Sequence, residues 1–342
     1  MLYSRLYSIE ADISGSSSAI SEARKNVASL DSATSSLPSR LSSIRGSGYL
    51  ALGNLETDIE LLSKSWSELA PSIKLTLANN VEPLTVQVNS LQSEARLLRS
   101  QINSGNIMNS QMSLSRLSTS ASSLRSRVYT EANKVNSPIR ELFSKVSNID
   151  ENMEIAEKTL AFFSQANFPL KEDESPILAY DGKILKGDKS EGTLYFTNYR
   201  FIFEVKKEVV LEKKFFIVTK KRTERTVSID KSIGAIEEIS KGRVGFLAWT
   251  GIYVRFKKSA GQEEIQFDVE GKEADNITKF FDYIIKGDAD RDITKNRGTT
   301  KTENIQKRLI QCSKCYAPYT REVYRGQKTV QCEYCGAQIL LE

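Results

Sequence analysis

The sequence predicts a multidomain protein: an all-α antiparallel coiled-coil rod, then a small barrel-like β-sheet with a C-terminal helix, then a cysteine-based metal module. Three observations predict this order. Apolar residues recur at alternating steps of three and four along the first 165 residues, the spacing of coiled-coil helices. Short β-rich runs follow over residues 170–290. All four cysteines lie in the last thirty-one residues.

The first region, residues 1–165, is punctuated by glycines at Gly46-Ser47-Gly48 and Ser104-Gly105-Asn106. We therefore expect three helices of roughly 40 to 60 residues, folded back as antiparallel neighbours. A four-four step through Leu77 and Val81 is a stutter in the heptad register. The register fits a three-helix monomer or self-association equally well. Four prolines lie inside the pattern and are expected to start, kink or interrupt helices: Pro38, Pro71, Pro83 and Pro138.

The second region, residues 170–290, contains β-rich runs of alternating apolar and polar residues. A helix with one apolar face is expected from Glu273 to Ile285. Seven or so antiparallel strands and this helix make a small barrel-like sheet whose open end the helix closes. The expected runs are 177–185, 192–197, 200–206, 209–219, 226–229, 233–239, 251–257 and 264–269.

The segment from Glu191 to Phe203 resembles the second and third strands of GRAM and other pleckstrin-homology (PH)-like domains. A glycine precedes a strand that ends in Thr197-Asn198, and the next strand begins with Arg200 and three apolar residues. Val227-Ser228-Ile229-Asp230, followed by two isoleucines, resembles a later strand pair of the family. The resemblance implies a PH-like fold over about a third of the chain, and a module that binds phosphoinositide headgroups, ubiquitin or peptides, or that holds complexes together.

Headgroup-binding members of that family usually carry a lysine and arginine cluster at the first hairpin. This chain has lysines there but no arginine in register: Lys183, Lys186 and Lys189. Arginine supplies the planar fork that clamps phosphate. A second basic run forms either a diffuse anion-attracting patch or a solvated hairpin: Lys213, Lys214, Lys220, Lys221, Arg222 and Arg225.

An apolar stretch interrupts the polar turn residues expected between two strands. If it forms a loop tip, Phe246, Leu247 and Trp249 make an apolar wedge beside Lys241 and Arg243. That composition suits a segment that enters a membrane interface. Alternatively, the strands extend through it and these side chains are core.

The cysteines form two Cys-x2-Cys pairs, separated by sixteen residues: Cys312, Cys315, Cys332 and Cys335. This spacing supplies four thiolates from two tight turns, so we expect a zinc ribbon over residues 309–342 that holds one structural Zn²⁺. Disulfides are disfavoured, because residues 1–12 lack the apolar stretch of a secretory signal. A charged, flexible linker is expected over residues 291–308.

The sequence contains no histidine, the usual general base and the commonest metal ligand. It also contains no Gly-x-Gly-x-x-Gly or P-loop motif and no apolar run long enough to span a bilayer. We therefore expect a non-enzymatic, cytoplasmic adaptor, with protein partners at the zinc ribbon and a protein or a peripheral anionic membrane at the PH-like domain. The arrangement resembles membrane-trafficking and remodelling adaptors such as the GLUE-domain subunits of ESCRT complexes. The alternative is a nucleic-acid-associated factor that binds through its zinc ribbon.

Overall fold

A computed structural model of the chain divides it into two compact units. Unit 1 comprises Met1–Arg40 and Leu55–Asp150, and unit 2 comprises Leu41–Asn54 and Glu151–Glu342. Each unit is described by itself. The structure describes residues 2–105, 107–185, 189–214, 217–246, 248–260, 264–297, 311–315, 319, 323, 329–332 and 334–341.

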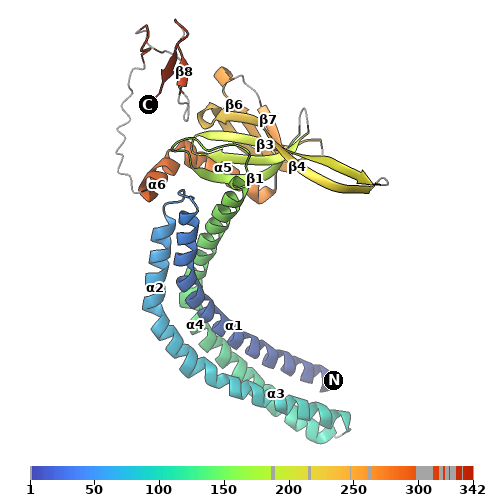
Figure 1. The fold of residues 1–342 in the computed structure, drawn as a ribbon. Helices are drawn as coiled ribbons and strands as arrows, with labels where there is room; N and C mark the ends of the chain where they lie inside the picture. Colours follow the sequence, from blue (N-terminus) through green and yellow to red (C-terminus); the bar gives the residue numbers. More distant parts are fainter. Residues whose placement is uncertain are drawn as a thin grey trace. The chain divides into compact units, whose positions relative to one another are not determined.

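Unit 1 consists of three helical runs, as the glycine positions predict (Figure 1), although the last residues of α1 and α4 belong to unit 2. The middle run is antiparallel to α1, because Asp31 accepts a hydrogen bond from Trp66 while Glu10, earlier in α1, pairs with Arg99. The third run lies parallel to α1, because Asp12 pairs with Arg125 and Arg40, later in α1, pairs with Asp150, later in the third run. The runs are α1 (Leu2–Gly46), then α2 (Leu55–Thr76), η1 (Leu77–Val81) and α3 (Glu82–Asn103), then α4 (Ile107–Phe163).

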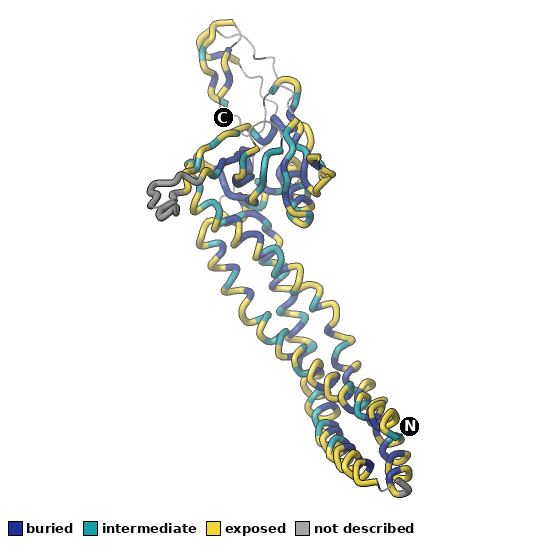
Figure 2. Tube along the Cα trace, turned by 90° about the vertical axis from the view of Figure 1, so that its right-hand side faces the viewer, coloured by how far each residue is buried: buried dark blue, intermediate teal, exposed yellow. Residues whose placement is uncertain are grey.

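The core of unit 1 is the predicted apolar stripe. Leu30, Leu62 and Val128, one from each helical run, are fully buried. Figure 2 shows the buried positions facing inward and the exposed ones outward along the helices. The stutter at Leu77 and Val81 appears as the π-helical segment η1, in which one extra residue is accommodated without ending the helix.

Seven antiparallel strands form one sheet in unit 2, in the order β4-β3-β2-β1-β7-β6-β5. Among the described residues, β4 and β5 are the edge strands, so the sheet is open. The strands are β1 (Pro176–Ile184), β2 (Glu191–Thr197), β3 (Arg200–Lys214), β4 (Ile217–Ser232), β5 (Ile236–Val244), β6 (Trp249–Phe256) and β7 (Glu264–Asp268). Two 3₁₀ turns lie between strands that are consecutive in the chain: η2 (Ile233–Ala235) connects β4 to β5, the two edge strands, and η3 (Lys258–Ala260) lies between β6 and β7.

The inner face of this sheet is apolar at every second position, as the alternation predicts. Phe201 and Phe203 of β3 are fully buried and contact the ring of Phe267 from β7. Helix α5 (Gly271–Ile285) packs its buried face, including Ile277 and Phe280, against β1, β5 and β6. An antiparallel seven-stranded sheet followed by one packed C-terminal helix is the PH-like layout, so the expected fold is confirmed.

Several boundaries differ from those expected from sequence. The runs 200–206, 209–219 and 226–229 belong to two long strands, β3 and β4, which pair along their length with register shifts. The start of the linker expected over residues 291–308 is helical, because Asp288–Asn296 form helix α6 with Ala289 and Ile293 buried; residues 298–308 lie outside the described residues. Pro38, Pro71 and Pro138 lie inside helices that continue through them.

The turn after α1 belongs to unit 2 and is hydrogen-bonded to strand β1 and helix α6. Buried Tyr49 donates its hydroxyl to the carbonyl oxygen of Ile177 at 3.0 Å. The Gly53 amide donates to Oδ2 of Asp292 in α6 at 2.8 Å, and Tyr283 of α5 donates to the same oxygen at 2.6 Å. These bonds explain why α6 is ordered although its composition resembles a linker.

Candidate metal centre and candidate membrane-contact loop

The four cysteine sulfurs lie within 4.8 Å of one another. Sγ of Cys312 is 3.6 Å from Sγ of Cys335, and Sγ of Cys315 is 3.5 Å from Sγ of Cys332. A disulfide would require about 2.05 Å. Four thiolates around one tetrahedral ion, with metal–sulfur bonds of about 2.3 Å, lie about 3.8 Å apart. The arrangement therefore fits one bound metal ion, and the four cysteines are free thiols rather than disulfides.

Local backbone geometry brings the second cysteine pair into position. The Gly336 amide donates to the carbonyl oxygen of Cys332 at 3.0 Å, and the Cys332 amide donates to Ala337 at 2.8 Å. Gly336 has φ 71°, a conformation that favours glycine. This turn joins β8 (Thr329–Gln331) to β9 (Gln338–Leu340), which pair antiparallel.

The electrostatics of the cluster favour thiolates. Backbone amides of Cys315 and Lys314 that point at the Cys312 sulfur lower the pKa of its thiol, burial raises it, and hydrogen bonds with Cys335 and Cys332 lower it as well, so that together they bring this pKa to about 6. The thiolate is the form that binds metal. Four protein ligands complete a tetrahedral shell, so a bound ion has a structural role and no open position for a substrate.

The apolar stretch between β5 and β6 forms a loop tip. Val244 pairs with Trp249 at its base. Phe246 is 102% exposed and Trp249 is 49% exposed, so neither is a core residue. Gly245 (φ 67°) and Ala248 (φ 52°) both adopt left-handed conformations, which turn the chain sharply at the tip. Leu247 lies outside the described residues.

The basic residues predicted beside this loop differ in their partners. Lys241 donates to both oxygens of Asp275 in α5, at 2.8 and 2.7 Å. Arg243 is exposed, and its carbonyl oxygen accepts a hydrogen bond from Tyr253, which braces the strand before the loop. Arg243 is thus the better placed of the two cations to meet an anion. Lys183 pairs with Glu191 at 3.0 Å.

The second basic run lies on the β3–β4 hairpin. Its backbone is described, with Lys220 opposite Glu212, Lys221 opposite Val210 and Arg222 opposite Val209. The side chains of these three residues lie outside the described part of the structure, as does Lys186.

A buried ionic group was not foreseen from the sequence. Arg200 is 5% exposed and donates two hydrogen bonds of 2.8 Å to the fully buried carboxylate of Glu174. Thr197 and the Lys171 amide donate to the same carboxylate. The Thr-Asn-x-Arg pattern that carries the PH-like resemblance therefore fixes the segment before β1 to the β2–β3 turn, a structural role. The signal in the sequence was Glu174, an acidic residue in the polar segment that precedes β1.

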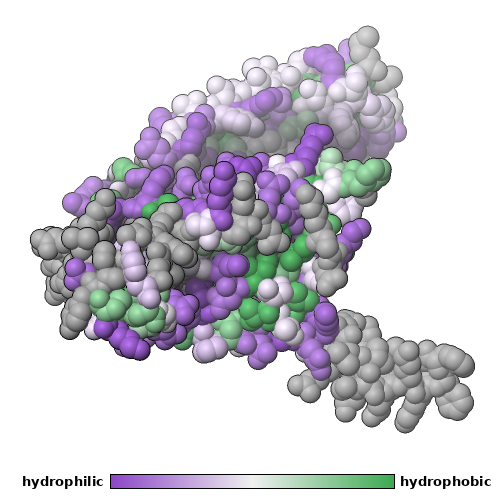
Figure 3. All heavy atoms as spheres, turned by 90° about the horizontal axis from the view of Figure 1, so that it is seen from above, coloured by the Kyte–Doolittle hydropathy of each residue, from purple (hydrophilic) through white to green (hydrophobic). Residues whose placement is uncertain are grey.

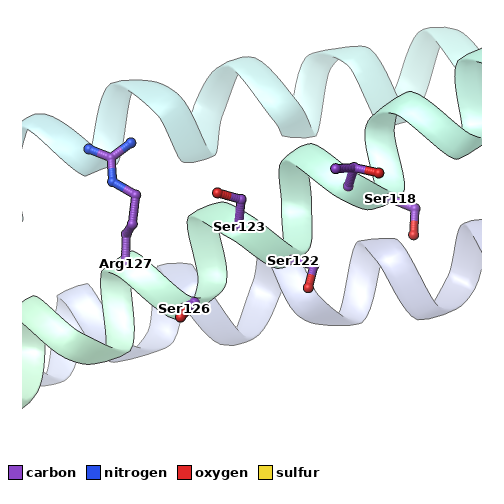
Figure 4. A pocket seen from close by; sticks show the side chains of 6 residues that line it. Ser118, Ser122, Ser123, Ser126 and Arg127 are labelled. Carbon is purple, nitrogen blue, oxygen red and sulfur yellow. The ribbon is translucent and has the colours of Figure 1, made fainter.

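Other described residues that expose large apolar side chains include Val86, Leu97 and Met112 on the helices of unit 1. Viewed from above, the surface is mostly polar, with small apolar patches (Figure 3). A shallow hollow on α4 is lined mainly by hydroxyl groups (Figure 4). Its one cation, Arg127, donates to Gln87 at 3.2 Å, and its lining carries no acid–base pair. No helix in the described part of the chain is long and apolar enough to cross a bilayer.

No protein-family model matches the chain, and no curated protein matches it. Among solved structures, the chain is similar to the Vps36 N-terminal PH domain, with 14% identity and a TM-score of 0.23, over 34% of this chain and 86% of that one. It is also similar to the linker-DH/PH domains of p115-RhoGEF (9% identity, TM-score 0.24, 83% and 98% coverage). Autoinhibited Vav1 matches with 10% identity and a TM-score of 0.25, over 96% and 67%. Similarities this weak carry no functional conclusion. The PH-like assignment rests on the strand order and the packed C-terminal helix, and the GRAM subtype stays a prediction.

Proposed function

We propose that this protein is a non-enzymatic adaptor that docks on anionic membrane surfaces through the β5–β6 loop of its PH-like domain. The observation that supports this is the full exposure of Phe246 at a tight loop tip, with Trp249 half exposed beside it. Exposed aromatic side chains on a braced loop match the composition of segments that enter the headgroup region of a bilayer.

The energies fit a transient contact. Burying one large apolar side chain contributes about 1.5–3 kcal/mol, and each basic residue near an anionic surface adds about 1 kcal/mol. Phe246, Trp249 and Arg243 together give an attachment of a few kcal/mol. Such a site becomes useful when several act at once. In this proposal the helical rod supplies reach and partner contacts, and the metal module recruits a protein, for which Tyr334 and Leu340 are exposed.

The test is co-sedimentation of the full chain with phosphatidylcholine vesicles that contain phosphatidylserine. Phe246→Ser is expected to weaken binding tenfold or more, because it removes one inserted side chain. Leu170→Ser is the control. Leu170 is also an exposed apolar side chain of unit 2 (40% exposed), but it lies outside the loop, so this substitution should leave binding unchanged. Trp249 fluorescence should shift to the blue on binding, whereas Trp66, 4% exposed in unit 1, should not respond.

Equal vesicle binding by the wild type and Phe246→Ser would contradict the proposal. So would binding of the wild type to a short RNA or DNA but not to vesicles, which would favour the nucleic-acid alternative.

A further inference from the structure

Helix α6 binds a segment that lies far away in the sequence, the turn over residues 49–53 that joins α1 to α2 (Figure 1). Oδ2 of Asp292 accepts hydrogen bonds from the Gly53 amide, 239 positions away, at 2.8 Å and from the Tyr283 hydroxyl at 2.6 Å. A Cβ atom on residue 53 would lie 2.7 Å from Oδ1 of Asp292, so any larger residue there would displace this carboxylate. The helix and the turn therefore fit each other closely.

All five carbonyl oxygens of the turn accept hydrogen bonds from side chains. Asn296 of α6 donates to Leu50 at 2.9 Å, and Lys295 of α6 donates to Gly53 at 3.4 Å. The other three carbonyl groups accept from the guanidinium of Arg45 and are those of Tyr49, Ala51 and Leu52. The polar groups of this backbone segment are thus satisfied in part by α6, which takes the place that water has around an ordinary surface turn.

The same helix also holds the segment before β1 and the turn between β2 and β3. Arg297, directly after α6, donates to Asp173 at 2.9 Å and to Ser175 at 2.8 Å. Asp290 accepts a hydrogen bond from Asn198 at 3.1 Å. Helix α6 therefore bridges two parts of unit 2 that are distant in sequence, the α1–α2 turn and the segment before β1.

Each of these two parts contains a strained residue. Leu52 (φ 57°) and Asp173 (φ 62°) adopt the left-handed conformation, which is unfavourable for residues with a Cβ and persists only where surrounding contacts hold it. Gly287 (φ 84°) separates α5 from α6, and a glycine can change its backbone conformation at little cost. The buried apolar residues of α6 are Ala289 and Ile293, so polar bonds make up most of its attachment.

We propose that α6 is a latch, which opens as one unit about Gly287 and releases the α1–α2 turn and the segment before β1 together. A glycine hinge, a small apolar contact and a strained residue in each segment that it holds are features of an element with two arrangements. In the open state, residues 288–297 join the connection between α5 and the metal module and lengthen it by up to about 35 Å. The latch thereby sets the reach of that module.

This inference goes beyond the membrane docking proposed above. None of the contacts that carry it involves the β5–β6 loop, and its test contains no lipid, so either proposal can fail alone.

Hydrogen exchange of the full chain, read by mass spectrometry, tests the latch through peptides that cover residues 47–54, residues 288–297 and strand β2. Asp292→Ala removes the acceptor of two hydrogen bonds, so the first two peptides should exchange about tenfold faster or more, while β2 keeps its protection. Tyr283→Phe removes one hydroxyl without a change of charge and should give the same pattern more weakly. Arg291→Ala is the matched control, because the ion pair of Arg291 with Asp288 stays within α6; it should change neither peptide.

Two further variants test whether the latch moves as one unit. Arg297→Ala removes bonds to the segment before β1, yet it should also accelerate exchange over residues 47–54. Gly53→Ala displaces Asp292 from the side of the turn and should in return accelerate exchange over residues 171–175, because coupling between two sites is reciprocal.

Four results would overturn the latch. If Arg297→Ala accelerates exchange only in residues 171–175, the two contacts are independent. If Asp292→Ala exposes β2 as much as α6, the helix is an integral part of the sheet rather than a separate element. The other two are an Arg291→Ala chain that behaves like Asp292→Ala, and exchange that neither Asp292→Ala nor Tyr283→Phe alters.

Discussion

At the scale of single residues, a buried ion pair holds the segment before β1 against the β2–β3 turn of the PH-like domain. Glu174 and Arg200 are joined by two parallel hydrogen bonds, and Arg200 also pairs with Asp230 at 2.7 Å. The guanidinium lies 5.6 Å from the ring of Phe168. Since removing one partner of such a pair leaves an uncompensated buried charge, the segment before β1 depends on this contact.

We expect Glu174→Gln to destabilise this region and to remove part of its acid sensitivity. Burial raises the pKa of Glu174, but hydrogen bonds from Arg200, the Lys171 amide and Thr197 lower it by more, to below its ordinary 4.5. Stability from the ionised carboxylate is therefore present above pH 4.5 and is lost as the pH falls through the folded-state pKa. Breaking the pair should cost about 3–5 kcal/mol at neutral pH.

Amide hydrogen exchange of β2 and β3 at neutral and acidic pH measures this effect. The control is Glu191→Gln, which breaks only the surface pair with Lys183 and should cost less than about 1 kcal/mol. Equal protection of β2 in the two variants at neutral pH would show that the buried pair contributes nothing.

The sequence predicted the cysteines of the metal centre, but it did not decide whether the side chains of the β5–β6 loop are buried or exposed. Cysteine spacing is a local property, so it predicts the cluster directly. Whether Phe246 is core or exposed depends on where β5 and β6 stop pairing, at Val244 and Trp249, and short apolar runs suit either answer. The strained conformation of Ala248 leaves no trace in the sequence.

At the scale of elements, the spacing of apolar residues predicted where the long helices lie. Prolines and charged residues were poorer guides to where helices end. Pro71 and Pro138 did not interrupt α2 and α4, because packing of the apolar stripe outweighs the loss of one backbone hydrogen bond at each. The composition of helix α6 predicts a linker, because charged residues dominate it. Its signal was the pair Ala289 and Ile293, four residues apart and both buried.

Deleting Asn79 should leave the helical rod folded and at least as stable as the wild type. Asn79 lies in η1, where steps of four connect Ile73, Leu77 and Val81. Removing one exposed residue brings the apolar positions before and after η1 back into one heptad phase and converts the π turn to α-helix. Thermal unfolding of the full chain followed by circular dichroism gives the comparison.

The control deletion removes Ser93, an exposed residue of α3 in regular register. It rotates the following apolar residues, Ala95, Leu98 and Ile102, away from the core and should destabilise unit 1 by several kcal/mol. If both deletions unfold unit 1 to the same extent, the π turn is required rather than tolerated.

At the scale of the whole molecule, changes in the sequence pattern predicted the order of the helical, β-rich and cysteine-containing regions. They did not predict which segments belong to which compact unit. Leu41–Asn54 precede the second helix, yet they belong to unit 2. The contact that shows this, from Tyr49 to Ile177, joins residues more than a hundred positions apart. Pattern analysis of neighbouring residues has no access to such a pairing.

Metal removal should unfold the C-terminal module and leave the rest of the chain folded. The described core of this module consists of Cys312, Val330, Cys332 and Ile339, with a few partly buried neighbours. So small a core does not stabilise a fold alone, and metal binding supplies the missing free energy. Native mass spectrometry should show one zinc ion per chain, and none in Cys312→Ser/Cys332→Ser.

Hydrogen exchange before and after chelation tests the independence of the parts. Amides of β8 and β9 should lose protection, while those of α3 and β2 should keep it, because their cores contain no cysteine. Gln331→Ser, beside a ligand but not one itself, should retain both the metal and the protection. A metal-free chain with a protected β8–β9 hairpin would contradict the structural role of the ion, because the remaining apolar contacts would then suffice to hold the module.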